Sequence, residues 1–144
     1  EFGYRVALQT AKAFVIDYRR ESQLSYSLSR LAQNHHDELI ASVQTYFEDN
    51  YSQAQVLDDV SAQFNVSKRT LIRRFKAALN ITPYAYLQRV RLEAAQKLLT
   101  ETQYEPEKIV QLVGYEDVSS FRRLFKQQTG LTLSVYRSRF AKRI

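Results

Sequence analysis

Residues 67–79 read Ser-Lys-Arg-Thr-Leu-Ile-Arg-Arg-Phe-Lys-Ala-Ala-Leu, a stretch that predicts a capped, basic helix. Ser67 suits the N-cap position, because its hydroxyl can accept a hydrogen bond from a free N–H group of the first turn. Leu71, Phe75 and Leu79 recur at four-residue spacing and form an apolar stripe, with cations on the other faces. A lone basic helix is more often a solvated surface than a binding element, by about 3 to 1, so the neighbouring sequence has to decide.

The segment just before this helix completes a helix-turn-helix pattern. Residues 57–64 (Leu-Asp-Asp-Val-Ser-Ala-Gln-Phe) predict a short helix, with Asp58 and Asp59 near the positive end of its dipole. We expect Asn65 to end that helix in the left-handed conformation, which asparagine tolerates better than most residues. A helix, a tight turn and a capped basic helix form the layout of a DNA-binding helix-turn-helix.

The pattern occurs twice in the chain. A shift of 50 positions matches Leu71, Arg73, Phe75, Lys76, Asn80, Ile81, Thr82, Tyr86 and Arg89 with Phe121, Arg123, Phe125, Lys126, Gly130, Leu131, Thr132, Tyr136 and Arg139. Upstream the shift is 49, so that Asn65 matches Gly114 and the second turn should hold one extra residue between 115 and 117. Gly114 can adopt the left-handed corner without steric cost.

These residues resemble the AraC/XylS-type transcription regulators, whose DNA-binding domain holds two helix-turn-helix units joined by one helix. The element apolar-x-Arg-x-Phe-Lys stands at residues 71–76 and again at 121–126. The joining helix carries Arg-Leu-x-x-Ala-x-x-Leu-Leu at 91–99, and Gly-x-Thr-x-x-x-Tyr-Arg stands at 130–137. The sequence departs from the family pattern at Ser61, Val110 and Leu133.

The predicted fold is all-α, with two helix-turn-helix subdomains joined by a long linker helix and preceded by an N-terminal helix and linker. The resemblance implies a DNA-binding domain over residues 36–144. Its first helix-turn-helix unit is expected at 37–81, the linker helix at 82–100 and the second unit at 105–142.

The linker helix should fix the spacing of the two units. Thr82 is its expected cap, and a rod of roughly 25 Å can hold two reading helices in successive major grooves, about 34 Å apart. We expect Arg89, Glu93 and Lys97 on its solvent face, and Ser134 as the cap of the last helix.

Residues 1–35 predict an amphipathic helix over about 1–18, followed by a polar linker over 22–34. They resemble the last helix and exit of the amidase-like, PfpI-type sensor domain found in one AraC-type subgroup. An ordinary packing helix of the DNA-binding domain explains the same residues about equally well. The chain has no methionine, even at position 1, so we expect a fragment of a longer protein.

Composition excludes several classes of protein. The chain has no apolar run near 18 residues, which argues against a membrane span. It also has no evident long apolar face opposite its cations, which argues against a membrane partner. It has no cysteine, so neither a disulfide framework nor a thiolate metal site is expected, and the cytoplasm is the natural location. His35 and His36 are adjacent rather than at helical ligand spacing, so no metal site is predicted.

Positive charge is concentrated in the duplicated part. Residues 1–50 hold 5 Lys or Arg against 7 Asp or Glu, whereas residues 51–144 hold 16 against 8. A net charge of +8 on the helix-turn-helix part indicates a polyanionic partner such as double-stranded DNA.

The resemblance implies base contacts at Arg69, Ile72 and Arg73 in the first unit and at Val118, Ser119 and Arg123 in the second. Arg73 and Arg123 can each bind the O6 and N7 atoms of guanine, which discriminates bases by roughly 1–3 kcal/mol, while Ile72 and Val118 suit thymine methyl groups. Phosphate contacts are assigned to Lys76, Thr82, Lys126, Thr132 and Arg137. Arg74 lies near the apolar stripe and is expected to cover Phe75 with its aliphatic stem.

The favoured function is sequence-specific binding of double-stranded DNA in transcription regulation, with both reading helices inserted into successive major grooves. A non-specific architectural DNA binder and a helical interaction module are the alternatives. Catalysis is not expected, because the chain lacks cysteine and a glycine-rich phosphate loop, and no cofactor is predicted. The resemblance also implies RNA polymerase as a partner, a homodimer formed through an absent N-terminal domain, and a small-molecule effector bound there.

Overall fold

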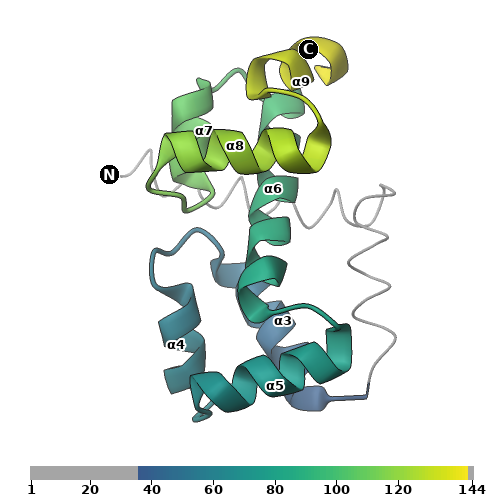
Figure 1. Ribbon diagram of the computed structural model, residues 1–144. Coiled ribbons are helices and arrows are strands. Elements are labelled where there is room, and N and C mark those ends of the chain that lie inside the picture. The colour runs from purple at the N-terminus through teal and green to yellow at the C-terminus, as the bar shows by residue number, and fades with distance from the viewer. Residues whose placement is uncertain (1–35, 143–144) are drawn as a thin grey trace.

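The structure, a computed structural model, describes residues 36–142, and in that part the chain forms helices and no strand (Figure 1). The helices are α3 (Glu38–Asn50), α4 (Val56–Gln63), α5 (Lys68–Leu79), α6 (Pro83–Glu101), α7 (Pro106–Leu112), α8 (Val118–Thr129) and α9 (Leu133–Phe140). The predicted all-α fold is confirmed, and none of these helices is both long and apolar enough to cross a membrane. The helix and linker predicted within residues 1–35 lie outside the described residues.

The first helix-turn-helix unit consists of α3, α4 and α5, and aromatic rings hold it together. α3 begins after its N-cap Asp37, whose carboxylate accepts a hydrogen bond from the Ile40 N–H at 3.2 Å. It buries Phe47, whose ring centroid lies 6.1 Å from the centroids of both Phe75 in α5 and Tyr86 in α6. Ring pairs at such distances attract one another beyond simple area burial. These contacts fix α5 against α3 and α6.

Both helix-to-helix turns have the predicted geometry. Asn65 and Gly114 occupy the left-handed region, with φ of 50° and 94° respectively. The turn between α4 and α5 spans residues 64–67, whereas the turn between α7 and α8 spans residues 113–117 and so holds one residue more. The extra residue and the two left-handed corners therefore confirm what the offset between the repeats predicts.

Helix α6 joins the two units. Thr82 is its N-cap, accepting a hydrogen bond from the Ala85 N–H at 3.1 Å, and Pro83 opens the helix as predicted. Its 19 residues make a rod of about 28 Å. Apolar residues of α6 such as Val90 and Leu98 belong to one hydrophobic cluster with residues from both units.

The prediction that Glu93 and Lys97 face solvent on α6 is wrong. Each is only 6% exposed, and every residue from Val90 to Leu99 is buried. Helices of both units pack on α6, among them α3 and α5 of the first unit and α7 and α9 of the second. The Lys97 ammonium lies 2.6 Å from a carboxylate oxygen of Glu101, one turn further along the helix.

The second unit consists of α7, α8 and α9 packed on the other end of α6. The predicted cap of α9 is wrong: Thr132, not Ser134, accepts a hydrogen bond from the Val135 N–H, at 3.2 Å. Ser134 already lies within the first turn of that helix. Leu133 occupies the first helical position, where the family pattern has another residue, and its side chain is buried. Val110, the second departure from that pattern, is fully buried as well.

The arrangement of the helices places α5 and α8 on one side of α6 (Figure 1). In this view α6 runs vertically, α8 passes in front of its upper part and α5 lies below its lower end. Both helices run from left to right, so they are related approximately by a shift along α6. The duplicated helices thus present their first turns in the same sense.

Candidate DNA-binding surface

The outward side of α5 carries the side chains assigned to base reading in the first unit. Arg69, Ile72 and Arg73 are all exposed, as is Lys76 one turn further on. Ile72 leaves 50% of its surface accessible, so an aliphatic side chain is available for contact with a thymine methyl group. The opposite side of the helix is buried through Leu71, Phe75 and Leu79.

The corresponding surface of α8 is organised by Asp117. Its carboxylate accepts hydrogen bonds from the Ser119 N–H at 3.0 Å and from the Ser120 hydroxyl at 2.7 Å. The bond from Ser120 is the main reason why the pKa of Asp117 is lowered, so this carboxylate is ionised at neutral pH. The Ser120 hydroxyl accepts a hydrogen bond from Arg123 at 3.3 Å. Ser119 and Arg123 are exposed, whereas Val118 is half-buried.

One cation of each recognition helix is paired with a carboxylate of the preceding helix. Lys68 in α5 forms an ion pair with Asp58 in α4, and Arg122 in α8 lies 2.8 Å from Glu107 in α7. Both pairs are solvent-exposed, so each stabilises the fold by well under about 1 kcal/mol. Lys68 and Arg122 are therefore partly neutralised where the recognition helices meet solvent.

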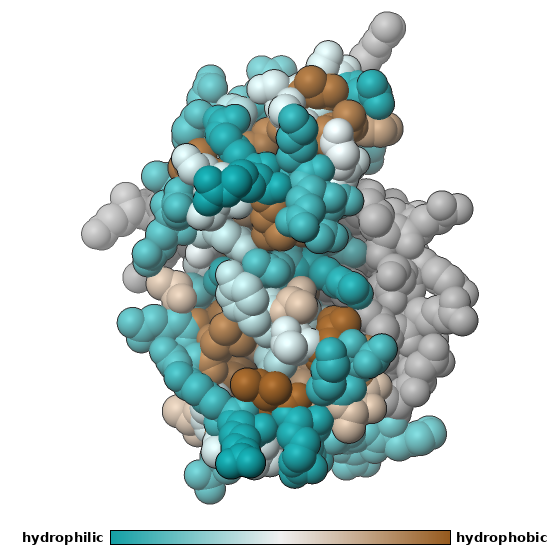
Figure 2. All heavy atoms as spheres, viewed as in Figure 1, coloured by the Kyte–Doolittle hydropathy of each residue, from teal (hydrophilic) through white to brown (hydrophobic). Residues whose placement is uncertain are grey.

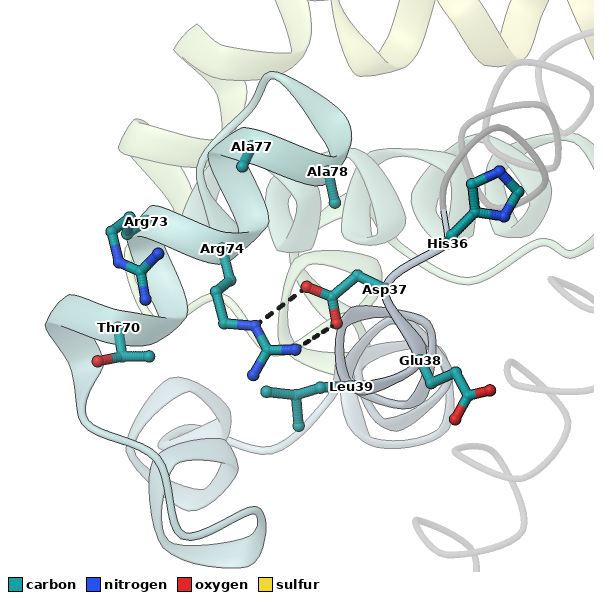
Figure 3. Close-up of a pocket in the computed structure, with 9 residues that line it drawn as sticks. All are labelled: His36, Asp37, Glu38, Leu39, Thr70, Arg73, Arg74, Ala77 and Ala78. Atoms are coloured by element: carbon teal, nitrogen blue, oxygen red, sulfur yellow. Dashed lines mark hydrogen bonds and ion pairs between the residues drawn. The ribbon is translucent and has the colours of Figure 1, made fainter.

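Arg74 is held by the first unit rather than directed toward a ligand (Figure 3). Its Nε and Nη2 atoms donate hydrogen bonds to the two carboxylate oxygens of Asp37, at 3.0 and 2.7 Å. Burial raises the pKa of Asp37, but the hydrogen bonds from Arg74 and Ile40 outweigh it and leave that pKa lowered. The neighbouring Arg73 extends away from Asp37 in the same view. Arg74 thus joins α5 to the start of α3, a role beyond the predicted cover of Phe75.

Thr82 and Thr132, both predicted phosphate contacts, are exposed caps at the N-termini of α6 and α9. The first turn of a helix carries N–H groups without intrahelical partners and the positive end of the helix dipole. Such a terminus attracts phosphate oxygens. The two caps occupy equivalent positions in the two repeats, directly after the recognition helices.

Arg137, a predicted phosphate contact, makes hydrogen bonds within the fold. Its Nε donates to the Leu99 carbonyl at 3.1 Å, and its Nη2 donates to the Thr102 carbonyl at 3.4 Å. These carbonyls lie at the C-terminal end of α6, where helix geometry leaves acceptors unsatisfied. The guanidinium therefore ties α9 to α6. A sequence pattern alone cannot show this, because the partners lie 38 and 35 residues away.

The face that bears both recognition helices is mainly hydrophilic over α5 and α8, with hydrophobic residues between them (Figure 2). Lys126 in the last turn of α8 is exposed, like Lys76 at the equivalent position of α5. No group of three or more His, Cys, Asp or Glu side chains within residues 36–142 could hold a metal ion. The arrangement suits contact with a polyanion that reaches both helices at once.

Residues 60–139, more than half of the chain, match the protein family described as helix-turn-helix domain. The chain belongs to the AraC-type helix-turn-helix family. The transcriptional activator RhaS of Klebsiella pneumoniae is 34% identical over 102 residues, a match that covers 71% of this chain and 36% of RhaS. The chain spans about a third of the length of the curated relatives it matches.

Two solved structures resemble this AraC-type domain. The C-terminal domain of AraT, a response regulator from Geobacillus stearothermophilus, superposes with a TM-score of 0.71 at 28% identity and covers 74% of this chain and 89% of that one. The DNA-binding domain of AdpA, a global transcriptional factor solved in complex with a target DNA, gives a TM-score of 0.65 at 25% identity. That match covers 73% of this chain and 94% of the AdpA domain.

Sequence reasoning missed two parts of this AraC-type surface. Asp117 could have been found from its place directly before α8, because aspartate is a common N-cap residue. The Arg74–Asp37 pair gave no local signal, since its members are 37 residues apart.

Proposed function

We propose that this chain binds double-stranded DNA at a specific sequence, with α5 and α8 in successive major grooves, and that the protein containing it regulates transcription. The observation that supports this proposal is the common side and direction of the two recognition helices (Figure 1). Helices related by a shift along α6 can meet two successive grooves of one duplex face in the same way. Helices related by a two-fold axis would instead meet the two grooves in opposite orientations.

In this proposal the exposed side chains of the first turns read bases. Arg73 and Arg123 bind guanine, Arg69 and Ser119 contact neighbouring base edges, and Ile72 contacts thymine methyl groups. Val118 contributes less to base contact, because its side chain is half-buried. Phosphates are held by Lys76, Lys126, Thr82 and Thr132.

Selection from random oligonucleotides with this chain tests the proposal. We expect a motif with two blocks of specified base pairs, whose centres lie about 10 base pairs apart. One short block would mean that a single unit reads bases. Equal affinity for all duplexes would contradict sequence-specific binding and favour the architectural alternative.

The remaining partners are proposed from the family resemblance alone. They are RNA polymerase, a second copy of the protein bound through a domain outside this chain, and a small-molecule effector at that domain. A regulator of this kind acts where the chromosome is, so we propose a cytoplasmic location and no catalytic activity. Sedimentation of this chain with and without its selected DNA would show whether it dimerises by itself.

A further inference from the structure

Arg91 lies at the junction of the two helix-turn-helix units. It projects from α6 and is 7% exposed. Its Nε donates a hydrogen bond to the Tyr51 carbonyl at 2.8 Å, and its Nη2 donates to the Gln53 carbonyl at 3.1 Å, both just after α3. The guanidinium carbon also lies 5.4 Å from the centre of the Tyr115 ring, in the turn between α7 and α8. A single buried cation thus contacts the first unit, the joining helix and the second unit.

The second contact at this junction is a backbone approach that requires glycine. A Cβ atom on Gly114 would lie 2.6 Å from the Tyr51 carbonyl oxygen and 3.1 Å from both Ser52 and the Arg91 guanidinium. Atoms at 2.6 Å overlap, so any side chain would push the second turn away from the first unit. Gln88 of α6 adds a hydrogen bond to the Tyr115 hydroxyl at 3.1 Å. The turn between α7 and α8 therefore meets the segment just after α3 at a distance that Gly114 sets.

The orientation of the two units matters for DNA binding, because the position of the base edges changes from one base pair to the next. One base pair advances a groove by about 3.4 Å and rotates it by about 34–36°. A recognition helix displaced by that amount no longer faces the same base edges. If α6 were the only connection, the two units could still bend and twist relative to each other. A second contact between the units, away from the axis of α6, restricts both motions.

We propose that Arg91 and Gly114 are positioning residues, which fix the separation and angle of α5 and α8 and so select the spacing between the two halves of the DNA site. Arg91 acts as a two-pronged donor to the end of α3. Gly114 allows the second turn to approach that donor. The part of this inference that concerns DNA rests on the proposed two-groove binding, but the part that concerns helix separation does not.

The first test measures the separation of the recognition helices without DNA. Ala77 and Gln127 are exposed at equivalent positions of α5 and α8, and the chain has no cysteine, so A77C/Q127C offers two unique sites for spin labels. In G114A and in R91K we expect the label-to-label distance distribution to shift or broaden by about 3 Å, the rise of one base pair. Lysine keeps the charge but cannot reproduce the two-pronged donation of arginine.

Gly130→Ala is the matched control. Gly130 also has a positive φ, of 78°, but nothing lies within 4 Å of an added Cβ. The G130A variant therefore has backbone strain like that of G114A but leaves the junction unchanged. Its label-to-label distance distribution should equal that of the unaltered protein. Circular dichroism of each variant establishes that it is folded, and R91K provides the comparison if G114A does not fold. Equal distributions in the folded junction variants and in G130A would overturn the inference.

The second test measures spacing preference on DNA. The probe is the site selected by the unaltered protein, with one base pair inserted or removed between its two halves. The unaltered protein and G130A should lose roughly tenfold in affinity per changed base pair, as loss of one unit's base contacts implies. In G114A and R91K this preference should fall to about threefold or move to another spacing.

The outcomes of the second test separate the two proposals. A uniform loss at every spacing in G114A and R91K, with the optimum unchanged, would overturn spacing selection by the junction. No spacing preference in the unaltered protein would overturn the two-groove function, and spacing selection with it, while the label distances would still decide whether Arg91 and Gly114 position the helices.

Discussion

Arg73 and Arg74 are neighbours in α5 but point in different directions, because successive residues of an α-helix are rotated by about 100° around its axis. Arg74 faces back toward α3, where both of its donors meet Asp37, whereas Arg73 extends away into solvent. A cation that already has a carboxylate partner gains little from a phosphate or a base. Arg73 is therefore the side chain of this pair that we assign to DNA.

Arg73→Ala should lower affinity for the selected site by about 1–3 kcal/mol and should lower affinity for random duplex much less, because a two-pronged contact to guanine is lost. Fluorescence anisotropy with both duplexes at one salt concentration measures the difference. Arg122→Ala, which removes a cation already paired with Glu107, is the control and should change both affinities only slightly. An equal loss on both duplexes would place Arg73 on a phosphate.

Arg137→Ala and Lys126→Ala should separate a structural cation from a phosphate contact. Arg137→Ala leaves two carbonyls at the end of α6 without their donor, so the free energy of unfolding should fall by about 1–3 kcal/mol. Lys126→Ala should leave stability nearly unchanged and reduce the slope of log affinity against log salt by about 0.9. Urea unfolding and salt titrations measure the two effects. A reduced salt slope in the Arg137→Ala variant would show that Arg137 also contacts a phosphate.

At the scale of helices and turns, local chemistry predicted most of the fold. Ser67 and Thr82 were identifiable as caps from residue type and position alone, and Asn65 with Gly114 as left-handed corners. The errors concern residues whose surroundings come from distant sequence. Glu93 on α6 is buried, and the alternation of charges along one helix carries no information on what packs against that helix.

The link between α3 and α5 should depend on pH through Asp37. Because its pKa is lowered in the folded protein, ionised Asp37 stabilises the fold above the ordinary value of about 3.9. This contribution is lost as the pH falls through the folded-state pKa. Asp37→Asn keeps a capping side chain but removes the charge, so it should cost up to about 1 kcal/mol at pH 7 and less near pH 3.

Urea unfolding of both proteins at several pH values measures that cost. Glu107→Gln is the control, because the partner of Glu107 is the exposed Arg122 and the pair joins α7 to α8. A cost for Asp37→Asn that stays constant from pH 7 to pH 3 would show that the charge of Asp37 does not stabilise the α3–α5 link.

For the molecule as a whole, α6 is the shared interior rather than a bridge between separate bodies. Residues of α3, α5, α7, α8 and α9 belong to one buried cluster that runs through this helix. Each unit alone would leave part of α6 exposed, and the lost apolar burial would cost roughly 25 cal/mol per Å². The two units should therefore unfold as one cooperative body.

Phe125→Ala tests this cooperativity, since Phe125 is fully buried in the second unit, with its ring centroid 5.4 Å from that of Tyr136. Removing such a ring costs about 3–5 kcal/mol. If the units unfold together, the slowest-exchanging amides of α3 and α5 should lose the same free energy of protection as those of α8, because all exchange through one global opening. Native-state hydrogen exchange with the exposed-site control Gln127→Ala measures it. Unchanged protection in α3 would show that the first unit is stable without the second, and that α6 joins them only as a rod.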